Sequence, residues 1–356
     1  MTTSVTAEKW LTELTGLPTA SGLEGEVVAW VRKWVARRSD LKLDEDSGGN
    51  LIIGQRGRKS AKPVLAVAHM DHPAFVITNG AGSFEFRGGV DAPYFADARI
   101  DVVSRADGPT GRVTSYDPET SEGTARFEGE VVPDDIAMWR FRSTRARKGR
   151  FRATACDDLA GVAAALSALD LARGRPRLRH LGVMLTRAEE VGLVGAIHAA
   201  KHQTIPAGAR LLSIETSREL PNARIGDGPI IRVGDRSTVF DQDMSNRITH
   251  AARSAGLAHQ RKLMDGGGCE ATAFGGYGYR STGLCLALGN WHNRGNLDRV
   301  EGGDLAAAQP MLEEISLDDF HGLIELLLIA TEAVDVDDPV ADSLDRLYES
   351  HRHYLQ

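Results

Sequence analysis

The stretch LGVMLTRAEEVGLVGA, residues 181–196, contains the local pattern from which the fold can be predicted. Its apolar run at 181–185 is typical of a buried strand, and the glycine-punctuated apolar end of the stretch is typical of a packed helix. Glu189 and Glu190 lie between these two segments. Adjacent carboxylates at the end of a buried strand repel each other unless a cation or a proton offsets their charge. The pair therefore belongs either to a cation-binding site or to the first turn of a helix, where negative charge is favourable.

Length and composition are those of an ordinary soluble globular protein. The chain has 356 residues, enough for two domains, with 42% hydrophobic and 26% charged residues. No apolar stretch approaches the roughly 18 residues of a membrane helix, and the first residues lack a signal-peptide core. The three cysteines have no metal-type spacing, which favours a reducing cytoplasm, and the net charge of -7 argues against general nucleic-acid binding. We therefore expect a cytoplasmic protein that contacts neither a membrane nor nucleic acid.

A histidine and an aspartate follow the apolar run at residues 63–68. His69 ends this predicted strand, and Asp71 comes two positions later. At this spacing the aspartate can hydrogen-bond one ring nitrogen and leave the other nitrogen for a metal. A lone histidine is more often structural, but ligands bind at the carboxyl ends of strands in open α/β sheets. The pattern makes His69 a candidate metal ligand.

Two aspartates stand at the start of a predicted alanine-rich helix that runs to Leu171. Asp157 and Asp158 fit an N-cap pair, which is a common structural role. One aspartate is enough for a cap, however, and a carboxylate can bridge two metal ions with its two oxygens. Chemistry alone does not decide which of the two aspartates would act as the bridge.

Further polar residues follow other predicted strands. Glu215 ends the apolar run at 210–214, and the strand LCLALG leads to His292, which is also compatible with an ordinary loop histidine. Three carboxylates and two histidines are the ligand set of a two-metal hydrolase, with one carboxylate left over as a base. The full candidate set is His69, Asp157 or Asp158, Glu189 with Glu190, Glu215 and His292.

The segment 74–150 has a different pattern, with short β-prone pieces between turns and no helical period. We interpret it as an inserted small β-barrel or sandwich within an α/β fold, a mixed sheet flanked by helices. Residues 1–73 and 151–356 would then form the two parts of the catalytic domain. The insertion ends in the basic run 140–152, which is either a solvated strand edge protected by charge or a contact for an anion or a neighbouring subunit. Helices are expected at 7–14, 25–38, 241–255 and 317–334, and a polar surface helix or tail at 343–356.

Seven motifs occur in order along the chain: AHMD, CDDLAG, EEVGLVGA, SIET, IGDGPII, GGGCEA and GNWHN. With this order and spacing the chain resembles the two-zinc aminopeptidases of the glutamyl aminopeptidase and tetrahedral (TET) aminopeptidase family. The resemblance extends from the first helices to about Val334. The position of the insertion, between Asp71 and Asp157, is similar to that in these aminopeptidases and differs from that in related carboxypeptidases and deacylases.

The resemblance implies a zinc-peptidase-like fold and a role for each candidate residue. It implies a metal-dependent aminopeptidase that hydrolyses peptides with two divalent ions, with zinc expected and cobalt or manganese as alternatives. It also implies a homo-oligomer, from a dimer to a dodecamer, with the inserted domain as the usual interface. The implied roles are His69 and Glu215 on one metal, Glu190 and His292 on the other, Asp157 as the bridge, Glu189 as general base and Asp71 as the residue that orients His69.

The sequence departs from the pattern of that family at a few positions. His72 stands where Glu is usual, Glu215 where Asp is usual, and Cys269 with Glu270 where Thr and Asp are common. Glu215 remains chemically competent, and we expect the changes at His72 and Glu270 to affect substrate choice more than metal binding. Two other functions fit the same residues: a metal-dependent deacylase or amidase, and a metal-free binding protein on an inactive peptidase fold.

Overall fold

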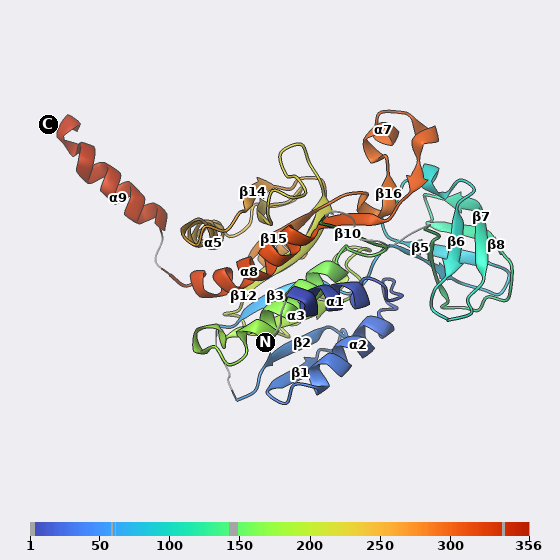
Figure 1. Cartoon of the computed structure of the whole chain (residues 1–356), viewed down its shortest axis with the longest axis horizontal. Helices are drawn as coiled ribbons and strands as arrows, with labels where there is room; N and C mark the ends of the chain where they lie inside the picture. Colours follow the sequence, from blue (N-terminus) through green and yellow to red (C-terminus); the bar gives the residue numbers. More distant parts are fainter. Residues whose placement is uncertain (1–3, 58–59, 61, 142–148, 337–338, 356) are drawn as a thin grey trace.

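The structure, a computed structural model, describes residues 4–57, 60, 62–141, 149–336 and 339–355 (Figure 1). Its body is built on an eight-stranded mixed sheet with the order β1-β2-β11-β3-β12-β15-β13-β14. The four central strands β11, β3, β12 and β15 are parallel, as in sheets covered on both faces, whereas β2 and β13 run antiparallel to their inner neighbours. The strands are β1 Leu41–Glu45, β2 Leu51–Gln55, β3 Val64–His69, β11 Leu181–Thr186, β12 Arg210–Arg218, β13 Ile230–Gly234, β14 Gln260–Leu263 and β15 Arg280–Leu288.

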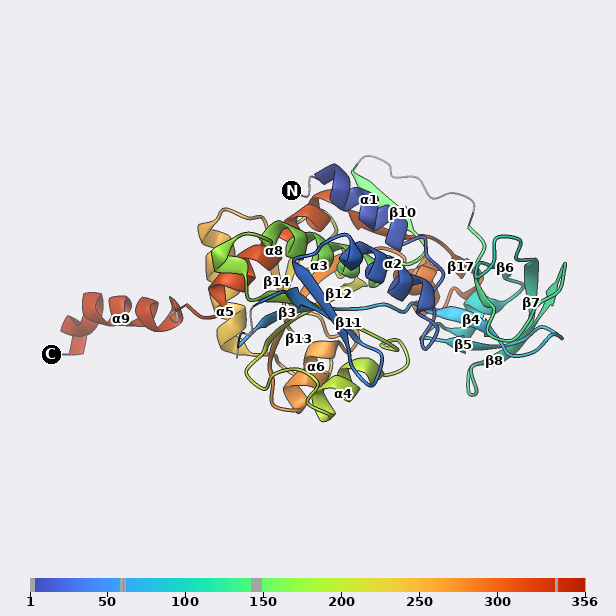
Figure 2. The ribbon, with the colours of Figure 1, turned by 90° about the horizontal axis from the view of Figure 1, so that it is seen from below.

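Helices cover both faces of the sheet (Figure 2). The larger hydrophobic core joins one face to five helices, of which α3 is buried along nearly its whole length because its sequence is alanine-rich and apolar all round. A smaller core joins the opposite face to two short helices. The first group is α1 Ser4–Leu14, α2 Gly25–Ala36, α3 Leu159–Ala172, α5 Gln242–Ser254 and α8 Leu317–Ala333; the second is α4 Val194–Lys201 and α6 Glu270–Gly276.

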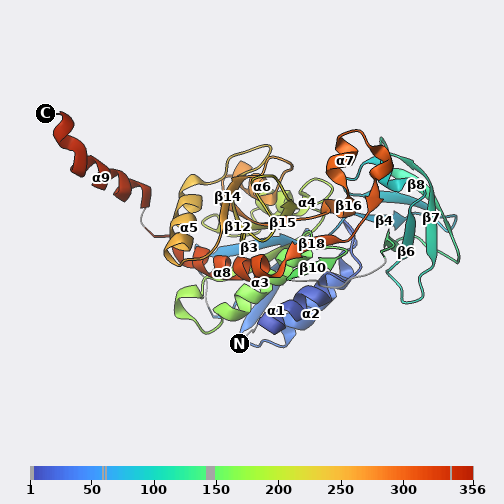
Figure 3. The same ribbon diagram turned by 45° about the horizontal axis from the view of Figure 1, so that its top comes forward.

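A closed β-barrel with the order β4-β5-β8-β7-β6-β9 lies at one end of the molecule (Figures 1 and 3). Its interior is filled by aromatic rings around Phe75, whose ring centroid lies 4.6 Å from that of Trp139. Edge-to-face packing of this kind stabilises a small barrel that has little room for other contacts. The strands are β4 Ala74–Ile77, β5 Ser83–Arg87, β6 Arg99–Val102, β7 Thr110–Asp117, β8 Glu122–Phe127 and β9 Ile136–Trp139.

In addition to the direct passage from β3 into β4, two elements link the barrel to the body. Strand β10, Arg150–Ala153, leaves the barrel and pairs with β18, Glu313–Ser316. The helix α7, Leu297–Glu301, lies beside the barrel (Figure 3), and its Val300 belongs to the barrel core. The short strands β16, Arg294–Gly295, and β17, Gln309–Pro310, pair with each other before and after the segment that contains α7. The last helix, α9 Pro339–His351, extends away from the body (Figure 1).

The predicted fold class is confirmed: a mixed sheet flanked by helices, with a small closed barrel. The packed helix predicted to start in the glycine-punctuated end of the stretch 181–196 is confirmed, with its first residue at Val194. The strand predicted at 210–214 is longer than expected and continues to Arg218. Part of the basic run, residues 142–148, lies outside the described residues. None of the helices in the described part of the chain combines the length and apolar content needed to cross a bilayer.

Candidate active site

Glu189 and Glu190 lie in the loop between β11 and α4. Since α4 begins at Val194, the interpretation that the pair occupies the first turn of a helix is wrong. The carboxylate of Asp71 holds this loop, because its Oδ1 accepts the backbone N–H of Glu189 at 3.0 Å and its Oδ2 accepts that of Glu190 at 3.1 Å. The hydroxyl of Ser21 also donates to Oδ2. Asp71 therefore fixes the backbone from which both glutamates project.

His69 lies at the end of β3, beside the end of β11 in the parallel register. Its Nδ1 is 3.2 Å from the carbonyl oxygen of Asp71 and 3.4 Å from Oδ1 of the same residue. Its Nε2 faces two carboxylates, Oδ1 of Asp157 at 3.5 Å and Oε1 of Glu215 at 3.7 Å. Burial alone would lower the pKa of His69, but the charge of Glu189 and the contacts with these carboxylates raise its pKa well above the usual value.

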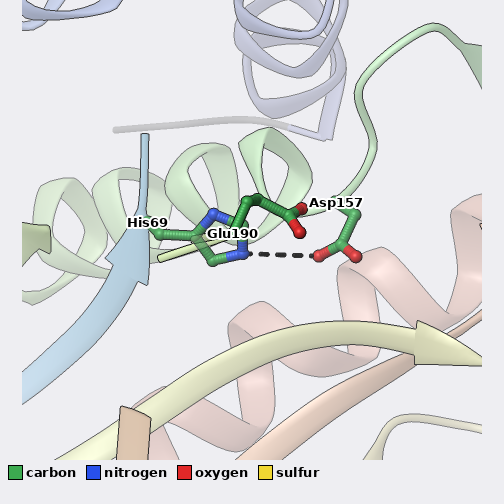
Figure 4. A group of neighbouring side chains, drawn as sticks. All are labelled: His69, Asp157 and Glu190. Carbon is green, nitrogen blue, oxygen red and sulfur yellow. Dashed lines mark ion pairs between the residues drawn. The ribbon is translucent and has the colours of Figure 1, made fainter. Parts of the chain in front are cut away.

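Asp157 lies between the two candidate histidines. Its Oδ1 faces His69, and its Oδ2 lies 3.6 Å from Nε2 of His292. Nε2 of His292 is also 3.2 Å from Oε2 of Glu190. Figure 4 shows His69, Asp157 and Glu190 converging on one space from different segments of the chain. Burial would raise the pKa of Asp157, but its contacts with both histidines hold that pKa below its usual value.

The neighbouring Asp158 is directed elsewhere. Its Oδ1 accepts a hydrogen bond from the hydroxyl of Thr216 at 2.8 Å, and its side chain makes no capping hydrogen bond to α3. Burial raises the pKa of Asp158 well above its usual value. The geometry thus distinguishes two residues that the sequence pattern alone could not.

Backbone contacts orient the residues around His292. This residue has a left-handed backbone with φ of 54°, a conformation that side chains other than glycine rarely adopt. Its Nδ1–H donates to the carbonyl oxygen of Gly89 at 2.8 Å, so Nε2 is left to face Asp157 and Glu190. The indole N–H of the adjacent Trp291 donates to Oδ2 of Asp157 at 3.0 Å. Because Gly89 follows β5, the barrel takes part in orienting the site.

The donor set fits divalent cations. Ligand atoms bonded at about 2.1 Å to one tetrahedral ion lie about 3.4 Å apart, close to the separations between the histidine nitrogens and the carboxylate oxygens. Among the described residues, Oδ1 of Asp157 and Oε1 of Glu190 are buried without a hydrogen-bond partner. Ligand atoms of His69, Asp157 and Glu190 all lie within 4.8 Å of one another. Positive charge stabilises buried carboxylates that have free oxygens and repel one another, and a bound metal would supply it.

The cluster opens into a cleft of about 490 Å³. Glu189, Glu190 and Glu215 contribute to one wall, and the predicted flexible glycine run, as Gly266 to Gly268, contributes to another. Trp291 and Arg232 are among the other residues that line the cleft. A ligand of the size of a short peptide end can therefore reach the carboxylates and His292.

The contacts of three residues beside the site, Glu313, His72 and Asn293, were not predicted from the sequence. Glu313 accepts backbone N–H groups of both Asp157 and His292, although it lies far from Asp157 in the sequence. His72 lies with Nδ1 at 2.6 Å from the carbonyl oxygen of Asp157, and its Nε2 lies 3.2 Å from Oδ1 of Asn293. The motifs HMDH and WHN place His72 and Asn293 next to candidate ligands, and this adjacency was the available signal.

A buried set of histidines and carboxylates at the carboxyl edge of a mixed sheet, open to a cleft, defines a metal-dependent hydrolase. A sequence profile of the M42 glutamyl aminopeptidase family matches residues 126–311, just over half of the chain. The chain belongs to this family, and the resemblance seen in its motifs is confirmed. The protein is therefore a metal-dependent aminopeptidase.

Individual proteins and structures agree with this assignment. A protein of Acetivibrio thermocellus, provisionally named an aminopeptidase, is 23% identical over 290 residues, which are 73% of this chain and 83% of that protein. The aminopeptidase APDkam598 of the archaeon Desulfurococcus kamchatkensis has a similar fold, with a TM-score of 0.74, 21% identity and coverage of 96% of this chain and 98% of that chain. The TET1 peptidase of Pyrococcus horikoshii, which can assemble into a tetrahedron or a large octahedral shell, has a TM-score of 0.71, 22% identity and coverage of 93% and 100%.

Glu270 provides a prediction for stability. Both of its carboxylate oxygens are buried without a hydrogen-bond partner among the described residues, and burial raises its pKa from 4.5 to about 7. Between these values the folded state keeps a proton that the unfolded state releases, so stability falls as pH rises through this window and levels off above it. In the metal-free protein, Glu270→Gln should remove about 2 to 3 kcal/mol of the loss between pH 5 and pH 8.

Urea unfolding of the metal-free protein at both pH values measures this difference. Glu325→Gln, at an exposed position on α8, is the matched control and should behave like the unmodified chain. A buried amide also has a cost, but that cost is the same at both pH values. Identical pH dependence for Glu270→Gln and the unmodified protein would show that Glu270 has the same pKa in the folded and unfolded states.

Proposed function

We propose that the site binds two divalent ions. His69 and Glu215 hold one ion, Glu190 and His292 hold the other, and Asp157 bridges them. The observation that carries this proposal is the position of Asp157, whose two oxygens each face a different histidine. Glu215 lies within 4 Å of His69, and Glu190 lies within 4 Å of His292. Asp71 orients His69 and holds the loop that carries the two glutamates.

We propose Glu189 as the general base for hydrolysis of an amino-terminal peptide bond. When bound, the two ions supply the Lewis acidity that polarises the peptide carbonyl and favours ionisation of water. Glu189 lines the cleft, and no ion pair among the described residues occupies its carboxylate. Burial and the nearby charges of Glu215 and Glu190 raise the pKa of Glu189, and this places it nearer the range in which a carboxylate exchanges protons at neutral pH. It would accept the proton of the attacking water and pass it to the leaving amine.

We propose zinc as the native metal, since imidazole and carboxylate ligands suit it, although cobalt and manganese accept the same donors. We further propose that the protein acts in the cytoplasm, on peptides. The domain organisation that we propose is a catalytic domain formed by residues 1–73 and 151–356, interrupted by an inserted domain at 74–150. The barrel strands β4 to β9 all lie within that insertion.

The assignment gives different roles to the adjacent glutamates, and this can be tested. Glu189→Gln should keep both metals and the fold while losing about 10² to 10⁴ in turnover, because it removes a proton acceptor. Glu190→Gln should instead lower the occupancy of one metal first. Metal content and turnover of an aminoacyl anilide are measured on both variants in one buffer. Loss of metal from Glu189→Gln with two ions retained in Glu190→Gln would reverse the two assignments.

The free amino terminus of the substrate gives a second test. Aminoacyl anilides should be hydrolysed, whereas the same compounds with an acylated amino group should not. The measurement is a panel of both sets at equal concentration, with the chelator-treated enzyme as the control without metal. Hydrolysis of only the acylated set would contradict peptidase action at this site and indicate a deacylase.

We also propose that the chain forms a homo-oligomer and that the insertion 74–150 provides the interface. The assembly of the Pyrococcus horikoshii TET1 peptidase into a tetrahedron or an octahedral shell supports this proposal. Light scattering should return a multiple of the chain mass of 38.4 kDa. A mass of one chain across all protein concentrations would contradict it.

A further inference from the structure

Glu313 connects two segments that both carry proposed metal ligands. Its side chain is fully buried, at 0% exposure, at the start of β18. Oε2 accepts the backbone N–H of Asp157 at 3.0 Å, and Oε1 accepts the backbone N–H of His292 at 2.9 Å. One carboxylate thus bridges two segments that are far apart in the sequence.

The strand β18 brings the backbones of both segments to the same place. On one side it pairs with β10, with Ala153 opposite Glu313, and β10 leads directly to Asp157. On the other side Glu314 exchanges two backbone hydrogen bonds with Gly289, which leads to His292. The backbone pairing of β18 therefore ends a few residues before Asp157 and before His292. The side chain of Glu313 adds a hydrogen bond to the backbone of each of these two ligands.

Neither ligand is held by regular secondary structure at its own amide. Asp157 lies in the turn before α3, and His292 lies in the 3-10 segment η3, Trp291–Asn293, with its left-handed backbone. Such a conformation persists where surrounding contacts impose it. The two oxygens of one carboxyl group can accept from both backbone N–H groups at once, which suits this task.

We propose that Glu313 is a positioning residue that sets the distance between Asp157 and His292, so that both can bind one metal pair. The inference rests on the proposed function, which makes these two residues ligands. Glu313 does not help line the cleft that the described residues form, and both of its oxygens already have backbone donors. It acts on the metal through the two ligand backbones and not as a ligand itself.

The variant Glu313→Gln tests this role. Glutamine keeps the shape of the side chain, but its amide nitrogen would face one backbone N–H, so one of the two segments is released. The affinity for Zn²⁺ alone, measured by competition with a chromophoric chelator on the metal-stripped full chain, should fall about 10- to 100-fold. With saturating metal, kcat should fall while KM changes little, because substrate contacts in the cleft are kept.

The matched control is Glu314→Gln, at the next position on β18, where the side chain is paired with Arg152 on the protein surface. It should bind Zn²⁺ like the unmodified protein. Glu313→Asp keeps the charge and both acceptor oxygens on a shorter side chain, and should give an intermediate affinity. Circular dichroism shows whether each variant is folded.

Equal Zn²⁺ affinity and kcat for Glu313→Gln and Glu314→Gln would overturn the proposal. If Glu313→Gln does not fold, Glu313→Asp decides, and an affinity equal to the control overturns the proposal as well. If neither variant folds, Glu313 is a structural residue and the proposal fails. Failure of the unmodified chain to bind Zn²⁺ would instead contradict the proposed function itself.

Discussion

The carboxylates of Asp157, Glu190 and Glu215 converge in a buried space where their negative charges repel one another. Two pairs of carboxylates in this region differ in the hydrogen bonds that they accept. Asp71 and Glu313 each accept two backbone N–H groups, so they anchor loops. Asp157 and Glu190 each keep a buried oxygen without a partner among the described residues, where a bound cation would offset the negative charge. The anchoring carboxylates thus maintain an arrangement that would otherwise be unfavourable until metal binds.

The central sheet could be predicted because its strands have strong local signals. Apolar runs ending at His69, and at Thr186 before the glutamate pair, identify buried parallel strands and the edge at which ligands gather. The conformation of the loop from Arg187 to Leu193 could not be predicted from such local signals. It depends on the carboxylate of Asp71, which accepts a backbone N–H of the loop from a distant segment of the chain.

Long-range contacts also account for what the sequence did not reveal about the site. No local period marks Glu313 as a buried residue, because it becomes buried through pairing of β18 with β10 and through the N–H groups of Asp157 and His292. The barrel is a similar case. The pattern of its strands could be recognised in the sequence, but the contacts by which it orients site residues could not. The carbonyl oxygen of Gly89 orients His292, and the hydroxyl of Tyr94 donates to the carbonyl oxygen of Gly295. The barrel is consequently part of the frame of the site.

The structure indicates a different role for the residues at positions 72 and 270, where the sequence departs from the family pattern. We expected them to affect substrate choice, yet neither residue is among the described residues that line the cleft. His72 instead lies against the backbone of Asp157, where its Nδ1 donates to the carbonyl oxygen of Asp157, and burial lowers its pKa. A glutamate here, as the family pattern usually has, would face that oxygen with a carboxylate and add negative charge beside Asp157 and Glu190. The imidazole donates a hydrogen bond instead, so Asp157 is held at its N–H by Glu313 and at its C=O by His72, on both sides of the carboxylate proposed to bridge the metals.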